Sequence, residues 1–218
     1  FLVSVICIGC LYMNWELLGF SNAEVFGHVW SQSWRFQDFP DGLFGTEQTV
    51  GTKIFPLIDP LPALIVNVFG SFLSLSSAYN ILFVLSLVLS AVAMRWMPVG
   101  ASEDQSLDVP LILLVFVSPI FWGILNSGLT EDWGVCLPIL AIVSLNRKHM
   151  VQAGVFVAVA AYWGLVLGWM SAILVSAYAV VNGRSRRELL KMWLTMGVCV
   201  LPLVGLHWDR LWLEGHRS

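Results

Sequence analysis

Seven apolar runs, separated by short polar stretches, make up most of this 218-residue chain. Charged residues are only 11% of the sequence, whereas soluble domains carry roughly 25%. A chain this poor in charge cannot cover a water-facing surface, so its outside must face lipid. At about 20 residues per crossing plus loops, the chain holds at most seven or eight spans. The sequence therefore predicts an all-α polytopic membrane protein.

The runs give a map of the predicted helices. They cover residues 1–18, 61–75, 78–97, 109–126, 133–146, 150–182 and 189–206. A signal peptide is the alternative to a first helix over 1–18, but no basic segment precedes this run and no small-x-small cleavage site follows it. Because the sequence begins at Phe1 inside an apolar run, we expect a processed chain or a piece of a longer one.

Lys and Arg residues predict the orientation, because they gather on the cytoplasmic side of membranes. Seven of the eleven lie at Arg95, at 147–148 and at 184–191. All seven are cytoplasmic if run 61–75 lies on or dips into the outer leaflet instead of crossing. That run is short and is led by Pro60 and Pro62. The outer face is then acidic and the inner face basic.

Run 150–182 is too long for one crossing. A single helix of this length would measure about 50 Å, against a hydrocarbon core of roughly 30 Å. We predict two short helices in a hairpin that turns near Gly164 and Gly168. The result is seven crossings in a transmembrane domain over residues 1–206, with a cytoplasmic N-terminus and an extracytoplasmic tail at 207–218.

The first extracytoplasmic loop, residues 21–77, contains the first candidate site. Its length is greater than a connection needs, and its aromatic content argues against disorder and for interfacial helices. Glu24 and His28 share one face of a predicted helix, and Trp30 lies towards its apolar side. A carboxylate and an imidazole can act as a general base and its orienting partner. The alternative is an ordinary first-turn Glu and an interfacial His.

Glu131 and Asp132 form the second candidate. Thr130 resembles an N-cap, and two carboxylates in a first helical turn are favoured by the helix dipole, so capping alone explains them. They can also reach the Glu24 loop. Together with Asp59 they give three acidic positions on one face, which could hold a divalent cation, although no DxD spacing is present. No other cofactor is predicted.

The remaining features exclude several classes of function. A net charge of −3 and a pI of 5.7 argue against a nucleic-acid partner. The four Cys residues lie in apolar stretches and are interpreted as buried thiols. The basic cluster at 184–187 is interpreted as an anchor for anionic lipid headgroups. The sequence has no P-loop, GxSxG or zinc motif.

Four short motifs follow one another along the chain. They are Glu24 with His28-Val29-Trp30, then Pro56-Leu57-Ile58-Asp59-Pro60, Ala78-Tyr79-Asn80 and Gly128-Leu129-Thr130-Glu131. Their succession resembles the N-terminal half of the polytopic GT-C-fold glycosyltransferases that use lipid-phosphate sugars, such as the protein mannosyltransferases. The similarity in order covers roughly residues 10–170. The family commonly has Asp where this chain has Glu24.

The resemblance implies transfer of a sugar from a polyprenyl-phosphate carrier to an acceptor on the outer face, with inversion at the anomeric carbon. It implies Glu24 as the general base on the acceptor hydroxyl. The substrate-binding residues that it implies are His28, Trp30, Asp59, Glu131 and Asp132. Family members usually have more crossings and often a soluble C-terminal domain, so a fragment, a split enzyme and an accessory subunit all fit this chain.

The alternative function is a non-catalytic scaffold subunit of a larger membrane complex. A transporter would need polar residues within spans and an internal repeat, and the sequence shows no repeat. The expected partners are membrane lipid, the polyprenyl-phosphate-sugar donor and, for a scaffold, other membrane subunits. The expected location is the bacterial inner membrane.

Overall fold

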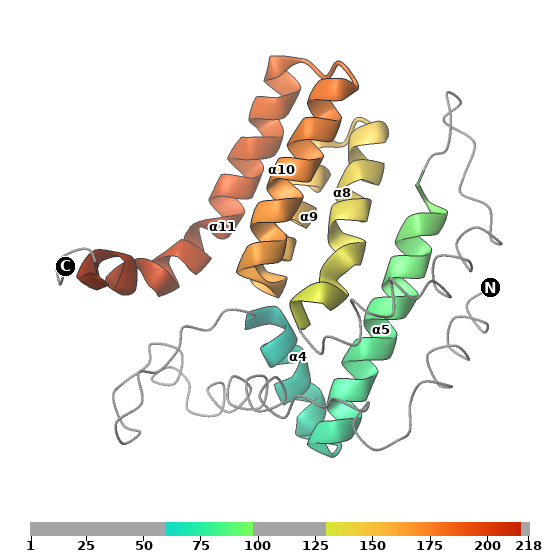
Figure 1. Cartoon of the computed structure of the whole chain (residues 1–218), viewed down its shortest axis with the longest axis vertical. Helices are drawn as coiled ribbons and strands as arrows, with labels where there is room; N and C mark the ends of the chain where they lie inside the picture. The colour runs from blue at the N-terminus through green and yellow to red at the C-terminus, as the bar shows by residue number, and fades with distance from the viewer. Residues whose placement is uncertain (1–59, 98–129, 215–218) are drawn as a thin grey trace.

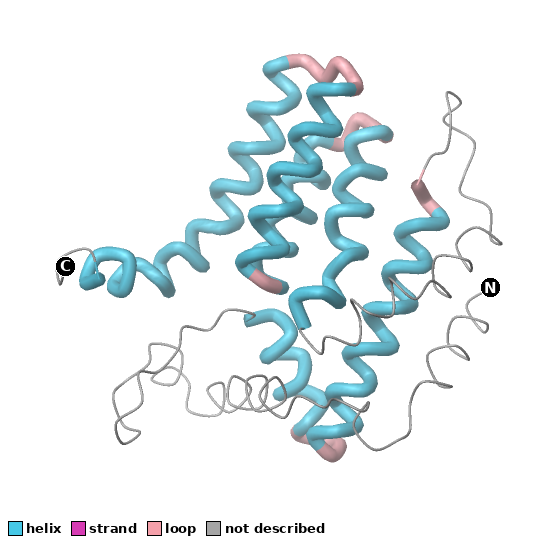
Figure 2. The backbone as a smooth tube through the Cα atoms, viewed as in Figure 1, coloured by secondary structure: helices cyan, strands magenta, loops and turns pink. Residues whose placement is uncertain are grey.

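The computed structural model describes residues 60–97 and 130–214, and every regular element within them is a helix (Figure 1). Figure 2 shows the helices joined by short turns, with no strand in the described ranges. The elements are, in chain order, α4 (Pro60–Gly70), α5 (Leu75–Arg95), the 3₁₀ helix η1 (Thr130–Val135), α8 (Cys136–Asn146), α9 (Met150–Trp163), α10 (Leu165–Val181) and α11 (Arg186–Glu214). The all-α prediction is confirmed for these residues. The predicted helices over 1–18 and 109–126 lie outside them.

Helix α9 is at the centre of the bundle. It packs against α8, α10 and α11, while α5 packs against α4, η1 and α8. Neighbouring helices α8, α9, α10 and α11 alternate in direction (Figure 1). The C-terminal ends of α5, α8 and α10 therefore lie at the same end of the bundle as the first residues of α9 and α11.

Glycines in two helices allow backbones to approach closely. A Cβ atom added at Gly154 of α9 would lie 2.5 Å from the carbonyl oxygen of Met192 in α11. A Cβ atom at Gly168 of α10 would lie 2.5 Å from the Cα atom of Ala161 in α9. Helices in membranes associate through close packing of this kind, because lipid gives no hydrophobic drive between them.

The break between α9 and α10 confirms that run 150–182 forms two helices. Gly164 is extended, with φ −173° and ψ 135°, and it both ends α9 and precedes α10. The two helices have 14 and 17 residues and pack against each other. Gly168, the other predicted turn residue, lies inside α10, where it provides the close contact with Ala161.

The start of α8 differs from the prediction. The α-helix begins at Cys136, its N-cap residue Val135 makes no side-chain hydrogen bond, and its first turn contains no acidic residue. Thr130 is therefore not the N-cap of α8, and Glu131 and Asp132 are not in its first turn. Pro138 explains the late start. Its ring nitrogen cannot donate, which is tolerated in a first turn but not in a helix interior.

Helix α11 is longer at both ends than the predicted span 189–206. It begins with a capping box, in which the Ser185 amide donates to Glu188 Oε2 at 2.9 Å and the Glu188 amide donates to Ser185 Oγ at 3.4 Å. It continues to Glu214, so most of the predicted tail is helical. The helix bends along its length (Figure 1) and contains Pro202. Proline removes a helical hydrogen bond and is a common cause of bends.

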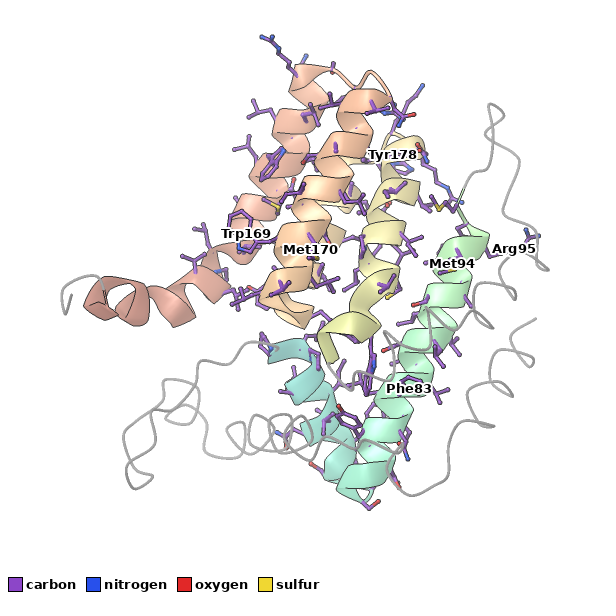
Figure 3. All side chains as sticks on the ribbon, in the orientation of Figure 1. Phe83, Met94, Arg95, Trp169, Met170 and Tyr178 are labelled. Atoms are coloured by element: carbon purple, nitrogen blue, oxygen red, sulfur yellow. The ribbon has the colours of Figure 1, made fainter. Side chains whose placement is uncertain are left out.

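Two described helices are long and apolar enough to cross a membrane, namely Ser77–Arg95 within α5 and Arg186–Gly205 within α11. The other apolar helices in the described ranges are shorter. Large apolar side chains are exposed on the outside of the bundle, among them Trp169 at 71% and Met170 at 65%, both on α10 (Figure 3). Exposed apolar surface of this extent is unusual in proteins that face water.

Candidate functional site

Three aromatic side chains join α5 to η1. Trp133 is 1% exposed and meets two rings edge to face, with centroids 4.9 Å from Tyr79 and 5.2 Å from Phe83. The interplanar angles are 68° and 70°, which is the arrangement that aromatic quadrupoles favour. We name Tyr79, Phe83 and Trp133 the aromatic junction. Figure 3 shows Phe83 on the half of α5 that is nearer to α4.

Local sequence positions the aromatic junction. Helix α5 is capped by Ser74, whose Oγ accepts from the Ser77 amide at 3.2 Å. The cap fixes where the helix begins, and Tyr79 and Phe83 at i and i+4 then share one face. Gly134 follows Trp133 directly. A Cβ atom there would lie 2.6 Å from Trp163 Cδ1, so only glycine lets η1 approach the end of α9 this closely.

Asn80 directly follows Tyr79 of the aromatic junction in the sequence. It is buried, with 2% of its surface exposed. Among the described residues, neither its amide nitrogen nor its amide oxygen has a hydrogen-bond partner. A buried polar group without a partner costs about 1–3 kcal/mol, and such groups are few in folded proteins. A carboxamide offers two donor hydrogens and an acceptor oxygen. It can therefore both donate a hydrogen bond to a hydroxyl group and accept one from it.

Four of the predicted site residues, Glu24, His28, Trp30 and Asp59, lie outside the described residues. Glu131 and Asp132 lie in η1, and their side chains are outside the described part. Their backbone leads directly into Trp133. The described ranges contain no group of three or more His, Cys, Asp or Glu side chains that could hold a metal ion. The divalent-cation site remains a prediction.

The structure places one of the four motifs in contact with Trp133, which follows the end of the fourth motif by two positions. The Ala78-Tyr79-Asn80 segment lies near the start of α5, and η1 begins with Thr130 and Glu131. Trp133 of η1 connects the two elements through its contact with Tyr79. Sequence reasoning did not assign a role to Trp133 or a partnerless amide to Asn80. The one sequence signal for these two residues is their position within or next to the motifs. Spacing and periodicity do not identify which residues will be in contact.

The two ends of the bundle differ in charge. Seven basic residues lie at one end, at the C-terminus of α5, in the α8–α9 and α10–α11 turns and in the first turns of α11. We name this set the basic end: Arg95, Arg147, Lys148, Arg184, Arg186, Arg187 and Lys191. The acidic residues of η1 lie towards the opposite end (Figure 1). Within the described ranges, Glu188 is the one carboxylate at the basic end.

Comparison with family models finds no match, and no curated protein or solved structure matches the chain either. The resemblance to GT-C glycosyltransferases therefore remains a prediction from the four motifs. Any function for this chain is argued from the residues at the aromatic junction and from the distribution of charge.

Proposed function

We propose that this chain is an integral membrane glycosyltransferase that transfers a sugar from a polyprenyl-phosphate carrier to an acceptor on the extracytoplasmic face. The observation that carries the proposal is the contact between Tyr79 and Trp133, with ring centroids 4.9 Å apart. Through this contact the Ala78-Tyr79-Asn80 motif meets a residue that is about 50 positions away in the sequence and that follows the end of the fourth motif by two positions. A shared site requires such an arrangement, and two unrelated capping segments do not.

The proposed setting is the bacterial inner membrane, with seven crossings, a cytoplasmic N-terminus and an extracytoplasmic C-terminus. The two helices of spanning length and the exposed Trp169 and Met170 support a lipid environment. The gathering of seven Lys and Arg residues at one end supports the orientation, because such residues favour the cytoplasmic side. The aromatic junction then belongs to the extracytoplasmic half of the bundle.

The proposed chemistry is a single displacement. Glu24 takes the proton of the acceptor hydroxyl while its oxygen forms a bond to the anomeric carbon. The bond between that carbon and the phosphate oxygen breaks, and the polyprenyl phosphate leaves with the electron pair. His28, Trp30, Asp59, Glu131 and Asp132 are the proposed substrate-binding residues. The three carboxylates among them are where a divalent cation is proposed.

Asn80 adds a binding group to this proposal. Its amide lacks a partner in the described structure, and a sugar hydroxyl would supply both a donor and an acceptor. The energy lost by burying the amide without a partner would be recovered when the donor sugar binds. The same logic explains why functional sites contain groups that weaken the folded protein.

The test compares Glu24→Gln with Glu47→Gln, a matched carboxylate in the same predicted loop. Membranes containing each variant receive polyprenyl-phosphate mannose or glucose labelled in the polyprenyl chain, and the release of polyprenyl phosphate is measured. We expect Glu24→Gln to reduce release by about 10²–10⁴-fold and Glu47→Gln to leave it unchanged, at equal amounts of inserted protein. Equal release by both variants would remove Glu24 as the base. Release no faster than in membranes without the protein would support the scaffold alternative.

A further inference from the structure

The basic end is built from three segments that are far apart in the sequence. Arg95 ends α5, Arg147 and Lys148 form the α8–α9 turn, and residues 184–191 span the α10–α11 turn and the first turns of α11. Six of the seven basic residues are exposed and Arg184 is half-buried. Figure 3 labels Arg95 on α5 and Tyr178 on α10, two of the helices that end at this surface.

Polar contacts hold the turns of the basic end together. Arg184 donates through Nη2 to the carbonyl oxygens of Leu145 at 2.7 Å and Asn146 at 3.5 Å, so the α10–α11 turn is fixed to the end of α8. The Tyr178 hydroxyl donates to Asn146 Oδ1 at 3.1 Å and strengthens the same connection. The relative positions of the two turns that carry the cations are therefore set before any ligand arrives, which lowers the entropic cost of binding one.

The α5 end joins the same surface. The guanidinium carbon of Arg147 lies 6.0 Å from the ring centroid of Trp96, which is a cation–π distance. Trp96 is itself 52% exposed. Trp residues favour the level of lipid headgroups, where an apolar ring meets a polar environment.

Glu188, the one carboxylate at the basic end within the described residues, does not cancel the positive charge there. Glu188 is occupied by its capping box, in which Oε2 accepts from both the amide and the hydroxyl of Ser185 at 2.9 Å. Lys148 and Arg184, from different turns, both act on this carboxylate electrostatically. Besides Arg95, the basic end has six cations and one carboxylate within the described residues, so positive charge is in excess there.

Exposed apolar side chains border the basic end directly. Val180 and Val181 end α10 at 62% and 84% exposure, and Leu190 and Leu194 follow on α11 at 58% and 60%. A surface that is cationic at its edge and apolar immediately below matches an anionic headgroup with acyl chains. A soluble polyanion, such as a nucleic acid, has no acyl chains that would contact the apolar border.

We propose that the basic end binds the phosphate of an anionic phospholipid, held between the α8–α9 turn and the α10–α11 turn. Lys148, Arg186 and Arg187 contact the headgroup, and Arg184 positions the two turns. Each Lys or Arg near an anionic membrane surface strengthens binding about fivefold. The binding is independent of the proposed sugar transfer.

The experiment uses the full chain purified in detergent and offered phosphatidylglycerol and phosphatidylcholine in equal amounts, with retained lipid measured by native mass spectrometry. We expect the wild-type protein to retain phosphatidylglycerol preferentially. Lys148→Gln/Arg186→Gln/Arg187→Gln should lower this preference by more than about tenfold, since three contacts are lost. The matched variant Lys148→Arg/Arg186→Lys/Arg187→Lys keeps the charge and should keep the preference, and Arg210→Gln, away from the basic end, should also keep it.

Other results would overturn the proposal. An unchanged preference in the Gln triple variant would show that these residues do not bind the lipid. Displacement of the lipid by inorganic phosphate, but not by chloride at the same ionic strength, would assign the surface to soluble phosphate compounds instead. If the Gln triple variant does not fold, Arg187→Gln alone should reduce the preference about fivefold, and no reduction would contradict the proposal equally.

Discussion

The ring of Tyr79 in α5 meets the ring of Trp133 in η1 edge to face, with centroids 4.9 Å apart and an angle of 68°. This contact joins the beginning of one candidate span to the short 3₁₀ helix that precedes α8. Trp133, which directly follows Asp132, thus lies against Tyr79 of the Ala78-Tyr79-Asn80 segment.

The first prediction concerns the energy of that contact. Trp133→Ala should destabilise the fold by roughly 3–5 kcal/mol, because a fully buried Trp is lost. Trp169→Ala, at a residue that is 71% exposed, is the matched control and should cost much less. A double-mutant cycle with Tyr79→Leu and Trp133→Leu should give a coupling of about 0.5–1.5 kcal/mol. Denaturant unfolding in detergent measures each value, and a coupling of zero would contradict the described contact.

The second prediction tests how closely α9 and α11 approach. Gly154→Ala would place a Cβ atom 2.5 Å from the Met192 carbonyl oxygen, and the helices must then separate at a cost of about 1–3 kcal/mol. Gly197→Ala is the matched control, since a Cβ atom there meets nothing within 4 Å. It should stabilise α11 by up to about 1 kcal/mol through helix propensity. Thermal unfolding of the two variants should therefore shift in opposite directions. Shifts of the same sign would mean that α9 and α11 are not packed as described.

The third prediction separates stability from function at Asn80. Asn80→Leu removes a buried amide without a partner, so the protein should become more stable by about 1–3 kcal/mol while the release of polyprenyl phosphate falls. Thermal unfolding and the donor assay, performed on the same preparation, measure the two effects. Greater stability with unchanged release would leave Asn80 outside the proposed site. Lower stability would show that the amide has a partner in the native protein.

Helix positions were largely predictable because apolar runs are the signal for both burial and lipid contact. The run 78–97 corresponds to α5. The break at Gly164 was predictable because one helix over 150–182 would be longer than the bilayer is thick. Helix ends were less predictable. Helix α11 continues through Asp209 and Arg210 to Glu214, since charged residues end an apolar run without ending a helix.

The candidate site was predictable only in part. The acidic residues were identified from their types and positions, but the partner of Trp133 was not, because a contact across about 50 residues leaves no local pattern. Pro138 could have indicated the late start of α8, but the helix was predicted from its apolar run alone. The unpaired amide of Asn80 depends on the packing around α5 and has no sequence signature.

The orientation of the bundle is tested by cysteine labelling in intact cells. On a background in which Cys7, Cys10, Cys136 and Cys199 are replaced, a Cys is introduced either at Ser71, in the turn between α4 and α5, or at Ser185, before α11. These two positions lie at opposite ends of the described bundle (Figure 1). A membrane-impermeant maleimide should label Ser71→Cys from outside and should reach Ser185→Cys only after the cells are lysed. Labelling of Ser185→Cys in intact cells, with Ser71→Cys protected, would place the aromatic junction on the cytoplasmic side and contradict the proposed extracytoplasmic sugar transfer.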